Sequence, residues 1–256
     1  MNQLVTLINH GPIAVITIDN PPVNALSPGV TEGLASCLKS ALADSTVEAI
    51  VIIGGGRTFV AGADIHEFAK SIAAGKGGGP DLTPPFTAIE NSPKPVVVAI
   101  HGAALGGGLE LAMAAHYRIA APDAQVGLPE ANLGIVPGAG GTQRLPRLVG
   151  MARAGALMLL GDKVSAEQAA QWGLIWRVVD DAALMTEATA LARHLASQPT
   201  RALGLIKQAL NASFGNTLDQ QLDLERDLQS IASATDDYRE GVAAFLEKRP
   251  ANFTGR

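Results

Sequence analysis

The chain has 256 residues, of which 47% are apolar and 17% are charged, and its net charge is about −5. A chain of this length can bury a large core, and its acidic balance argues against nucleic acid or an anionic membrane surface as a partner. The single cysteine, Cys37, excludes an internal disulfide and fits a reducing compartment. Because the apolar content is high, we expect part of the surface to be buried in an oligomer.

The N-terminal sequence MNQLVTLINHGP has no basic segment followed by an apolar core, so it does not have the pattern of a secretory signal. No apolar run reaches the length of a transmembrane helix. We therefore expect no membrane insertion and a cytoplasmic location.

Apolar patterning in the first half alternates between strands and helices, which is typical of an α/β fold. Ser27 and Pro28 are expected to cap and begin a helix that runs to about residue 43. The runs at 49–54 and 96–100 are continuously apolar, as in buried parallel strands. Further strands are expected at 4–8, 13–19 and 117–120.

The second half is mostly helical. Ser165 begins a stretch with capping-box spacing, which predicts a short helix closed by Gly173. Beyond it, helices are expected at 182–197, 200–212, 217–234 and 236–247. We therefore predict a core at 1–180 that holds the active site and a helical C-terminal region at 181–256.

Two loops of small residues can offer backbone N–H groups to a ligand. Gly106, Gly107 and Gly108 lie between an apolar run and a helical stretch, where the helix N-terminus adds about half a positive charge. The other loop, at 61–64, ends in Asp64, which can cap the helix after it. These loops can bind an oxygen with developing negative charge, or they can be ordinary tight turns.

Two glutamates are candidates for acid–base chemistry. Glu110 comes two residues after the glycines, and Glu130 lies in a Gly-Leu-Pro-Glu sequence. Each can be structural, because a first-turn glutamate favours the helix dipole and an acid after a proline turn is often exposed. Together they can orient a water and divide general-acid and general-base duties. The sequence leaves open whether they meet in space.

Other signals are weaker. Metal-binding, P-loop and G-x-S-x-G patterns are absent, so we expect no metal. His66 is either an exposed first-turn residue or a ligand contact. Phe245 and Lys248 form either an exposed helix face or a contact for a phosphorylated ligand. The segment at 71–85, which contains GKGGGP, is interpreted as a mobile loop near the mouth of the site or a passive surface insertion.

Several long motifs resemble the crotonase family, also called the enoyl-CoA hydratase/isomerase family. They are NPPVNAL (20–26), AGADI (61–65), GAALGGGLELA (102–112), GLPEANLGIVPGAGGTQRLPRLVG (127–150) and FLEKRPANF (245–253). They cover nearly the whole chain in order. Among family members, the chain is most similar in these motifs to the hydratase half of bifunctional enoyl-CoA hydratase/3-hydroxyacyl-CoA dehydrogenases, and a free-standing hydratase is expected.

This resemblance implies a crotonase-like α/β spiral of ββα units, with two roughly perpendicular sheets and a helical trimerisation region. It replaces the open doubly wound sheet that the strand–helix alternation alone suggests. A homotrimer or a homohexamer built from two trimers is expected. The substrate is an acyl-CoA, so coenzyme A is carried on the substrate and no separate cofactor is expected.

The family's site residues map onto this sequence one by one. The two N–H groups that bind the thioester oxygen fall on Ala63 and Gly107, and the two catalytic carboxylates fall on Glu110 and Glu130. The remaining expected contacts with CoA or substrate are Ala61, Asp64, Ile65, Gly106, Phe245 and Lys248, the last two in the same or a neighbouring subunit. His66 stands where many members have lysine or arginine, which weakens a phosphate contact there.

Because both glutamates are present, the resemblance implies hydration of a trans-2-enoyl-CoA to a 3-hydroxyacyl-CoA. A Δ3,Δ2-enoyl-CoA isomerase using one glutamate, or another crotonase-type acyl-CoA enzyme, is an alternative within the fold. A non-catalytic acyl-CoA-binding protein is an alternative of another class.

Overall fold

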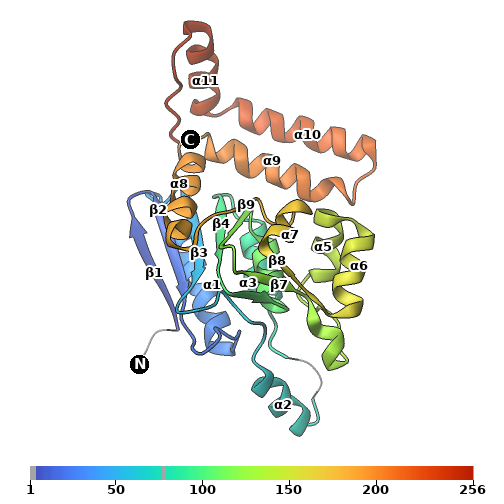
Figure 1. Ribbon diagram of the computed structural model, residues 1–256. Coiled ribbons are helices and arrows are strands. Elements are labelled where there is room, and N and C mark those ends of the chain that lie inside the picture. The colour runs from blue at the N-terminus through green and yellow to red at the C-terminus, as the bar shows by residue number, and fades with distance from the viewer. Residues whose placement is uncertain (1–3, 77–78, 256) are drawn as a thin grey trace.

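The computed structural model describes residues 4–76 and 79–255 (Figure 1). These residues contain a six-stranded sheet in the order β1-β2-β3-β4-β6-β9 and a three-stranded sheet in the order β5-β7-β8. The strands are β1 (Val5–His10), β2 (Ile13–Ile18), β3 (Ala49–Gly54), β4 (Val96–Ile100), β5 (Ala103–Leu105), β6 (Tyr117–Ala120), β7 (Gln125–Gly127), β8 (Lys163–Ser165) and β9 (Arg177–Val178). The separate second sheet agrees with the family expectation and replaces the single open sheet.

The larger sheet is parallel from β2 to β9, and only β1 pairs antiparallel with β2. Apolar side chains are buried on both of its faces, and every residue of β4 is buried. A parallel strand covered on both faces needs a continuous apolar sequence, which is why β3 and β4 could be recognised. The five predicted strands are confirmed within two residues at their ends.

Helices of the first 180 residues surround these strands. Ser27, Asp64 and Ser165 each accept a hydrogen bond from a first-turn backbone N–H, so the three predicted caps are confirmed. The helices at 83–90 and 151–160 do not follow from the sequence patterns above. The helices are α1 (Pro28–Ala43), α2 (Ile65–Ala73), α3 (Thr83–Glu90), α4 (Gly107–Ala114), η1 (Pro129–Leu133), α5 (Gly141–Val149), α6 (Met151–Leu160) and α7 (Ala166–Gln171).

The segment expected to be one loop at 71–85 is partly helical. It includes the last turn of α2 and the first turn of α3. Gly77 and Gly78, in the middle of that expected loop, lie outside the described residues. The expectation of a single 15-residue loop is therefore wrong at both ends. Helix α2 continues to Ala73, and α3 already begins at Thr83, with prolines in its first turn.

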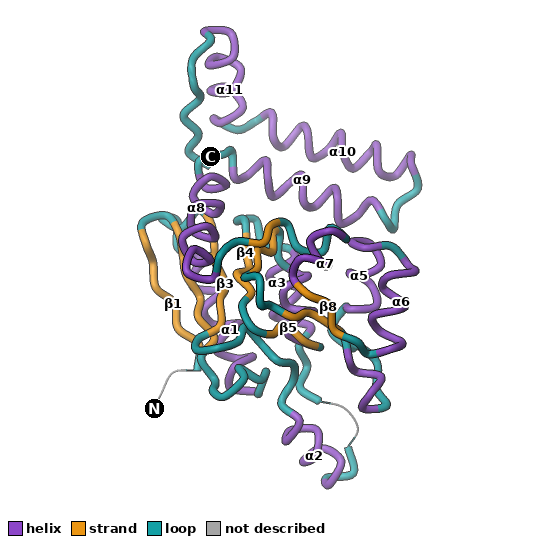
Figure 2. The backbone as a smooth tube through the Cα atoms, viewed as in Figure 1, coloured by secondary structure: helices purple, strands orange, loops and turns teal. Residues whose placement is uncertain are grey.

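The C-terminal helices follow the short turn η2 (Asp181–Ala183) and are α8 (Leu184–Ala196), α9 (Thr200–Ser213), α10 (Leu218–Ser233) and α11 (Asp236–Glu247). Leu184, Ala188, Ala192 and Leu195 of α8 are buried against the larger sheet. Figure 2 shows α9 and α10 as a pair beyond the strands, with α11 leading away from them. The predicted division at residue 180 stays a prediction.

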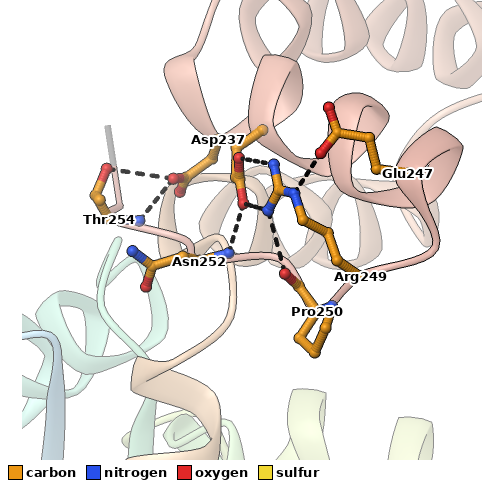
Figure 3. A network of polar contacts seen from close by, with 7 residues as sticks. Asp237, Glu247, Arg249, Pro250, Asn252 and Thr254 are labelled. Atoms are coloured by element: carbon orange, nitrogen blue, oxygen red, sulfur yellow. Dashed lines mark hydrogen bonds and ion pairs between the residues drawn. The ribbon is translucent and has the colours of Figure 1, made fainter.

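The segment after α11 is tied back to that helix by side-chain carboxylates (Figure 3). Asp237, which is buried, accepts hydrogen bonds from the Thr254 and Gly255 N–H groups at 2.7 and 2.9 Å. Arg249 donates to both carboxylate oxygens of Glu240 at 2.7 and 2.9 Å. Because these bonds hold both ends of the tail segment, the tail runs along α11 toward the core.

Among the described residues, no helix has the length and apolar character needed to span a membrane.

Candidate active site

Two loops that leave neighbouring strands form one wall of the site. Val60 pairs with Ala104 in a parallel bridge, which places the 61–64 loop beside the turn at 105–108. Asn24 secures the approach to the first loop, because its side-chain amide donates to the Gly55, Thr58 and Phe59 carbonyls at 2.7–3.1 Å. The two predicted donor loops therefore lie side by side.

The backbone amides of Ala63 and Gly107 are the open donors of these loops. Ala63 pairs with Leu26 through the N–H of Asp64 and the C=O of Gly62, which leaves its own N–H out of the bridge. Gly107 is the first residue of α4, where the N–H has no partner within the helix. Within residues 4–76 and 79–255, neither amide donates a hydrogen bond. A Cβ on Gly107 would lie 3.8 Å from the Ala63 nitrogen, so the two amides are close.

Glu110 lies in the first turn of α4 and is only 2% exposed. Its Oε1 accepts hydrogen bonds from the N–H groups of Ala139 and Gly141, at 2.8 and 2.7 Å. Burial raises the pKa of Glu110, while these two bonds and the charge of Arg144 oppose the increase. The carboxylate is therefore fixed through one oxygen.

Glu130 lies in η1, directly after Pro129. Its Oε2 is buried and has no hydrogen-bond partner within the described residues. Burial raises the pKa of Glu130 to about 7, and the negative charge of Glu110 adds to the increase. A carboxyl group with a pKa near neutrality can both give and take a proton at physiological pH.

Both glutamates line one cavity of about 460 Å³. Ala63, Gly106 and Gly107 line the same cavity, so the open amides and the two carboxyl groups converge there. The rest of the wall is largely apolar and includes Phe68, Leu82, Leu133, Ile135 and Val136. This combination can hold an apolar chain with its polar head against the amides.

Of the remaining predicted contacts, Ala61 and Ile65 line the cavity, whereas Asp64, Phe245 and Lys248 do not. The Asp64 carboxylate accepts the His66 N–H at 2.9 Å and caps α2. Phe245 and Lys248 are at the end of α11, and Figure 1 shows α11 and α2 at opposite ends of the molecule. Within one chain these two residues do not meet the others.

The residues that hold Glu110 were missed by sequence reasoning. Ala139 and Gly141 act through backbone N–H groups, which any residue type except proline carries. The glycine-rich stretch at 138–141 is the only signal of this role in the sequence, and it does not indicate which carboxylate its N–H groups bind. The apolar residues of the wall had no pattern that marked them as ligand contacts.

A second cavity, of about 380 Å³, lies between α9 and the far end of α4. Two cations there bind carbonyls at that end of the helix. Arg118 donates to Ala112 and Ala115, at 3.2 and 2.8 Å, and Lys207 donates to Ala114 at 3.3 Å. These side chains satisfy carbonyls that the helix leaves free.

The model of the enoyl-CoA hydratase/isomerase family matches residues 9–256. The chain belongs to this family. The match includes both donor loops, both glutamates and the C-terminal helices. The family recognised from the sequence motifs, also known as the crotonase family, is thereby confirmed.

Known relatives cover nearly all of the chain. A 1,2-epoxyphenylacetyl-CoA isomerase from Escherichia coli is 45% identical over 253 residues, which are 95% of each chain. A probable enoyl-CoA hydratase from Bacillus subtilis is 45% identical over 251 residues, again 95% of each chain. A crystal structure of an enoyl-CoA hydratase subunit from Geobacillus kaustophilus is 36% identical, covers 99% of this chain and 98% of its own, and has a TM-score of 0.90. Similar relatives thus carry different activities.

Proposed function

We propose that this crotonase-family protein is an enoyl-CoA hydratase that adds water to the double bond of a trans-2-enoyl-CoA. The observation that supports this most is the presence of two carboxyl groups, Glu110 and Glu130, in the same cavity as the open amides of Ala63 and Gly107. Addition of water needs one group to take a proton and another to give one, and the cavity offers both.

The Ala63 and Gly107 amides bind the thioester oxygen and stabilise the negative charge that develops on it. Loss of one such donor typically costs about 2.7–4 kcal/mol of transition-state stabilisation. The substrate supplies coenzyme A, and the reaction needs no separate cofactor. Ala61 and Ile65 line the path of the CoA moiety, Asp64 contributes through its backbone, and Phe245 and Lys248 reach the CoA of a neighbouring subunit.

Glu110 and Glu130 divide the proton transfers. Glu110 takes a proton from the water as its oxygen bonds to C3, and Glu130 gives a proton to C2. Glu110 then carries a proton and Glu130 is ionised, so a proton passes from one to the other through solvent before the next cycle. The raised pKa of Glu130, about 7, supports its role as the acid.

A Δ3,Δ2-enoyl-CoA isomerase is the second candidate, because it needs the same amides and only one of the two carboxylates. The relative named a 1,2-epoxyphenylacetyl-CoA isomerase is an isomerase of another acyl-CoA substrate. In a Δ3,Δ2-enoyl-CoA isomerisation, one carboxylate removes a proton from C2 and returns it to C4. The same amides would hold the thioester oxygen. Conversion of a 3-enoyl-CoA without hydration of a 2-enoyl-CoA would favour this activity.

The test is loss of absorbance of the conjugated thioester with crotonyl-CoA and with a longer trans-2-enoyl-CoA. We expect rapid hydration by the wild type and rates lower by orders of magnitude in Glu110→Gln and Glu130→Gln. Glu167→Gln is the matched control, because Glu167 is an exposed first-turn glutamate of α7. Near-normal rates in either active-site variant would contradict the two-glutamate mechanism. Acyl-CoA binding without turnover in the wild type would indicate a binding protein instead.

A further inference from the structure

Arg144 of α5 connects two parts of the protein that line the cavity. Its Nε and Nη2 donate to the two oxygens of Glu90 at 3.0 and 2.7 Å, which is a bidentate ion pair. Its Nη1 donates to the carbonyl of Ala139 at 2.7 Å. The side chains of Arg144 and Glu90 are 12% and 30% exposed, so the guanidinium is shielded from water and the Glu90 carboxylate partly so.

The backbone segment at 139–141, to which Arg144 donates a hydrogen bond, is also the segment that binds Glu110. The C=O of Ala139 accepts from Arg144, and the N–H of the same residue donates to Glu110 Oε1. Gly140 has a φ of +103°, and a side chain there would collide with Arg144 Nη1. The glycine therefore both allows the turn and leaves room for the guanidinium.

Glu90, at the other end of the ion pair, is the last residue of α3. The first residue of that helix, Thr83, and its cap, Leu82, line the cavity. Arg144 thus joins the helix that begins at the cavity wall to the backbone that holds Glu110.

We propose that Arg144 is a positioning residue for Glu110, with Glu90 as its anchor. This inference rests on the proposed function only for the role of Glu110. Arg144 fixes the segment at 139–141, this segment holds Glu110 Oε1, and Glu110 Oε2 is left to meet water. No hydrogen bond to Oε2 is present within the part of the chain that the structure describes.

Arg144 also affects the charge state of Glu110. The charged groups that interact with Glu110 come from two elements: Arg144 from α5 and Glu130 from η1. Glu90 of α3 pairs with Arg144 on the other side of the guanidinium. Arg144 lowers the pKa of Glu110, which burial raises. Removal of the guanidinium takes away its charge and loosens the two N–H donors, so both effects should raise the pKa of Glu110 further.

The test compares Arg144→Gln and Arg144→Lys with the wild type. Because small displacements of a reacting group can cost about 100-fold in rate, we expect kcat to fall by that order in Arg144→Gln with little change in KM. Arg144→Lys keeps the positive charge but loses the planar guanidinium that binds Glu90 and Ala139 together. The pKa of Glu110 should therefore be closer to that of the wild type than kcat is. Arg177→Gln, which removes an exposed ion pair with Glu187, should leave both unchanged.

A measurement without turnover separates this inference from the proposed reaction. In protein labelled with ¹³C at the glutamate carboxyls, the Glu110 signal is assigned by its loss in Glu110→Gln and followed against pH. We expect its midpoint to move to higher pH in Arg144→Gln, with the circular dichroism of the folded protein retained. An unchanged midpoint would overturn the inference, whatever reaction the wild type catalyses. A hydratase with normal kcat in Arg144→Gln would overturn it as well.

Discussion

The chemistry at the residue scale depends on two carboxyl groups in different surroundings. Glu110 accepts two short backbone hydrogen bonds, which favour its ionised form, whereas the buried Oε2 of Glu130 has no partner in the described chain. A like charge nearby disfavours ionisation of both together. The state suited to acid–base chemistry is therefore the one in which Glu110 and Glu130 together carry a single proton.

A pH profile tests this shared proton. Hydration needs Glu110 ionised and Glu130 protonated, and dehydration needs the reverse, so both directions use the pair with one proton. We expect bell-shaped profiles of kcat/KM with the same two limbs in both directions. Activity should fall as the pH rises through about 7, because Glu130 then loses its proton. A profile that stays flat from pH 6 to 9 would show that Glu130 is not the acid.

The sequence identified these residues but not their arrangement. Glu110 and Glu130 stand 20 positions apart, and only the fold shows that they line one cavity. The donors from Ala139 and Gly141 leave no trace in residue type, because every residue except proline has the N–H group. The cap that Asp64 provides for α2 was predicted from the sequence, and its backbone contact with CoA stays a prediction.

At the scale of elements, α4 connects the active site with a cationic region behind it. Its first turn carries Gly107 and Glu110, and its last carbonyls accept from Arg118 and Lys207. Positive charge at the C-terminal end complements the helix dipole. His116 lies beside these cations, and its Nδ1 accepts from the Val96 N–H at 3.0 Å.

His116 should make the protein sensitive to acid. Burial, with Lys207 and Arg118 nearby, lowers the pKa of His116 from 6.5 to about 3. Between these values the unfolded chain binds one more proton, so stability falls as the pH decreases, by up to about 1.4 kcal/mol per pH unit. In His116→Asn, whose amide oxygen can accept from Val96, melting temperature should fall less between pH 6.5 and 4.5. His10→Asn on the exposed end of β1 is the control, and equal acid sensitivity in wild type and His116→Asn would contradict the assignment.

Helix prediction failed where the starting signal resembled a loop. The first turn of α3 is Thr83-Pro84-Pro85, and prolines are tolerated there because first-turn N–H groups need no partner within the helix. Helices α9, α10 and α11 were located closely because they have long patterns and clear boundaries. The strands β5, β7, β8 and β9 have two or three residues each, which is too short to show the alternation of apolar and polar residues that predicts a strand.

At the scale of the whole molecule, the arm of C-terminal helices has an apolar surface that one chain leaves uncovered. Exposed large side chains follow one another along α9 and α10, and α11 adds Phe245, which is 83% exposed. They include Ile206 and Leu210 on α9, Phe214 directly after α9, and Leu218 and Leu222 on α10. An exposed apolar surface of this kind indicates association with another chain.

We predict that the protein is a trimer or a dimer of trimers that associates through this arm. Light scattering at micromolar concentration should give three or six times the mass of one chain. Leu218→Glu places a charge at the start of α10 on a side chain that is 73% exposed, so it should lower the mass while the fold of each chain is retained. Ile8→Glu, on the exposed edge strand β1, is the matched control and should leave the mass unchanged. A monomeric wild type would contradict the prediction. It would also exclude CoA contacts from Phe245 and Lys248, because neither residue lines the cavity of its own chain.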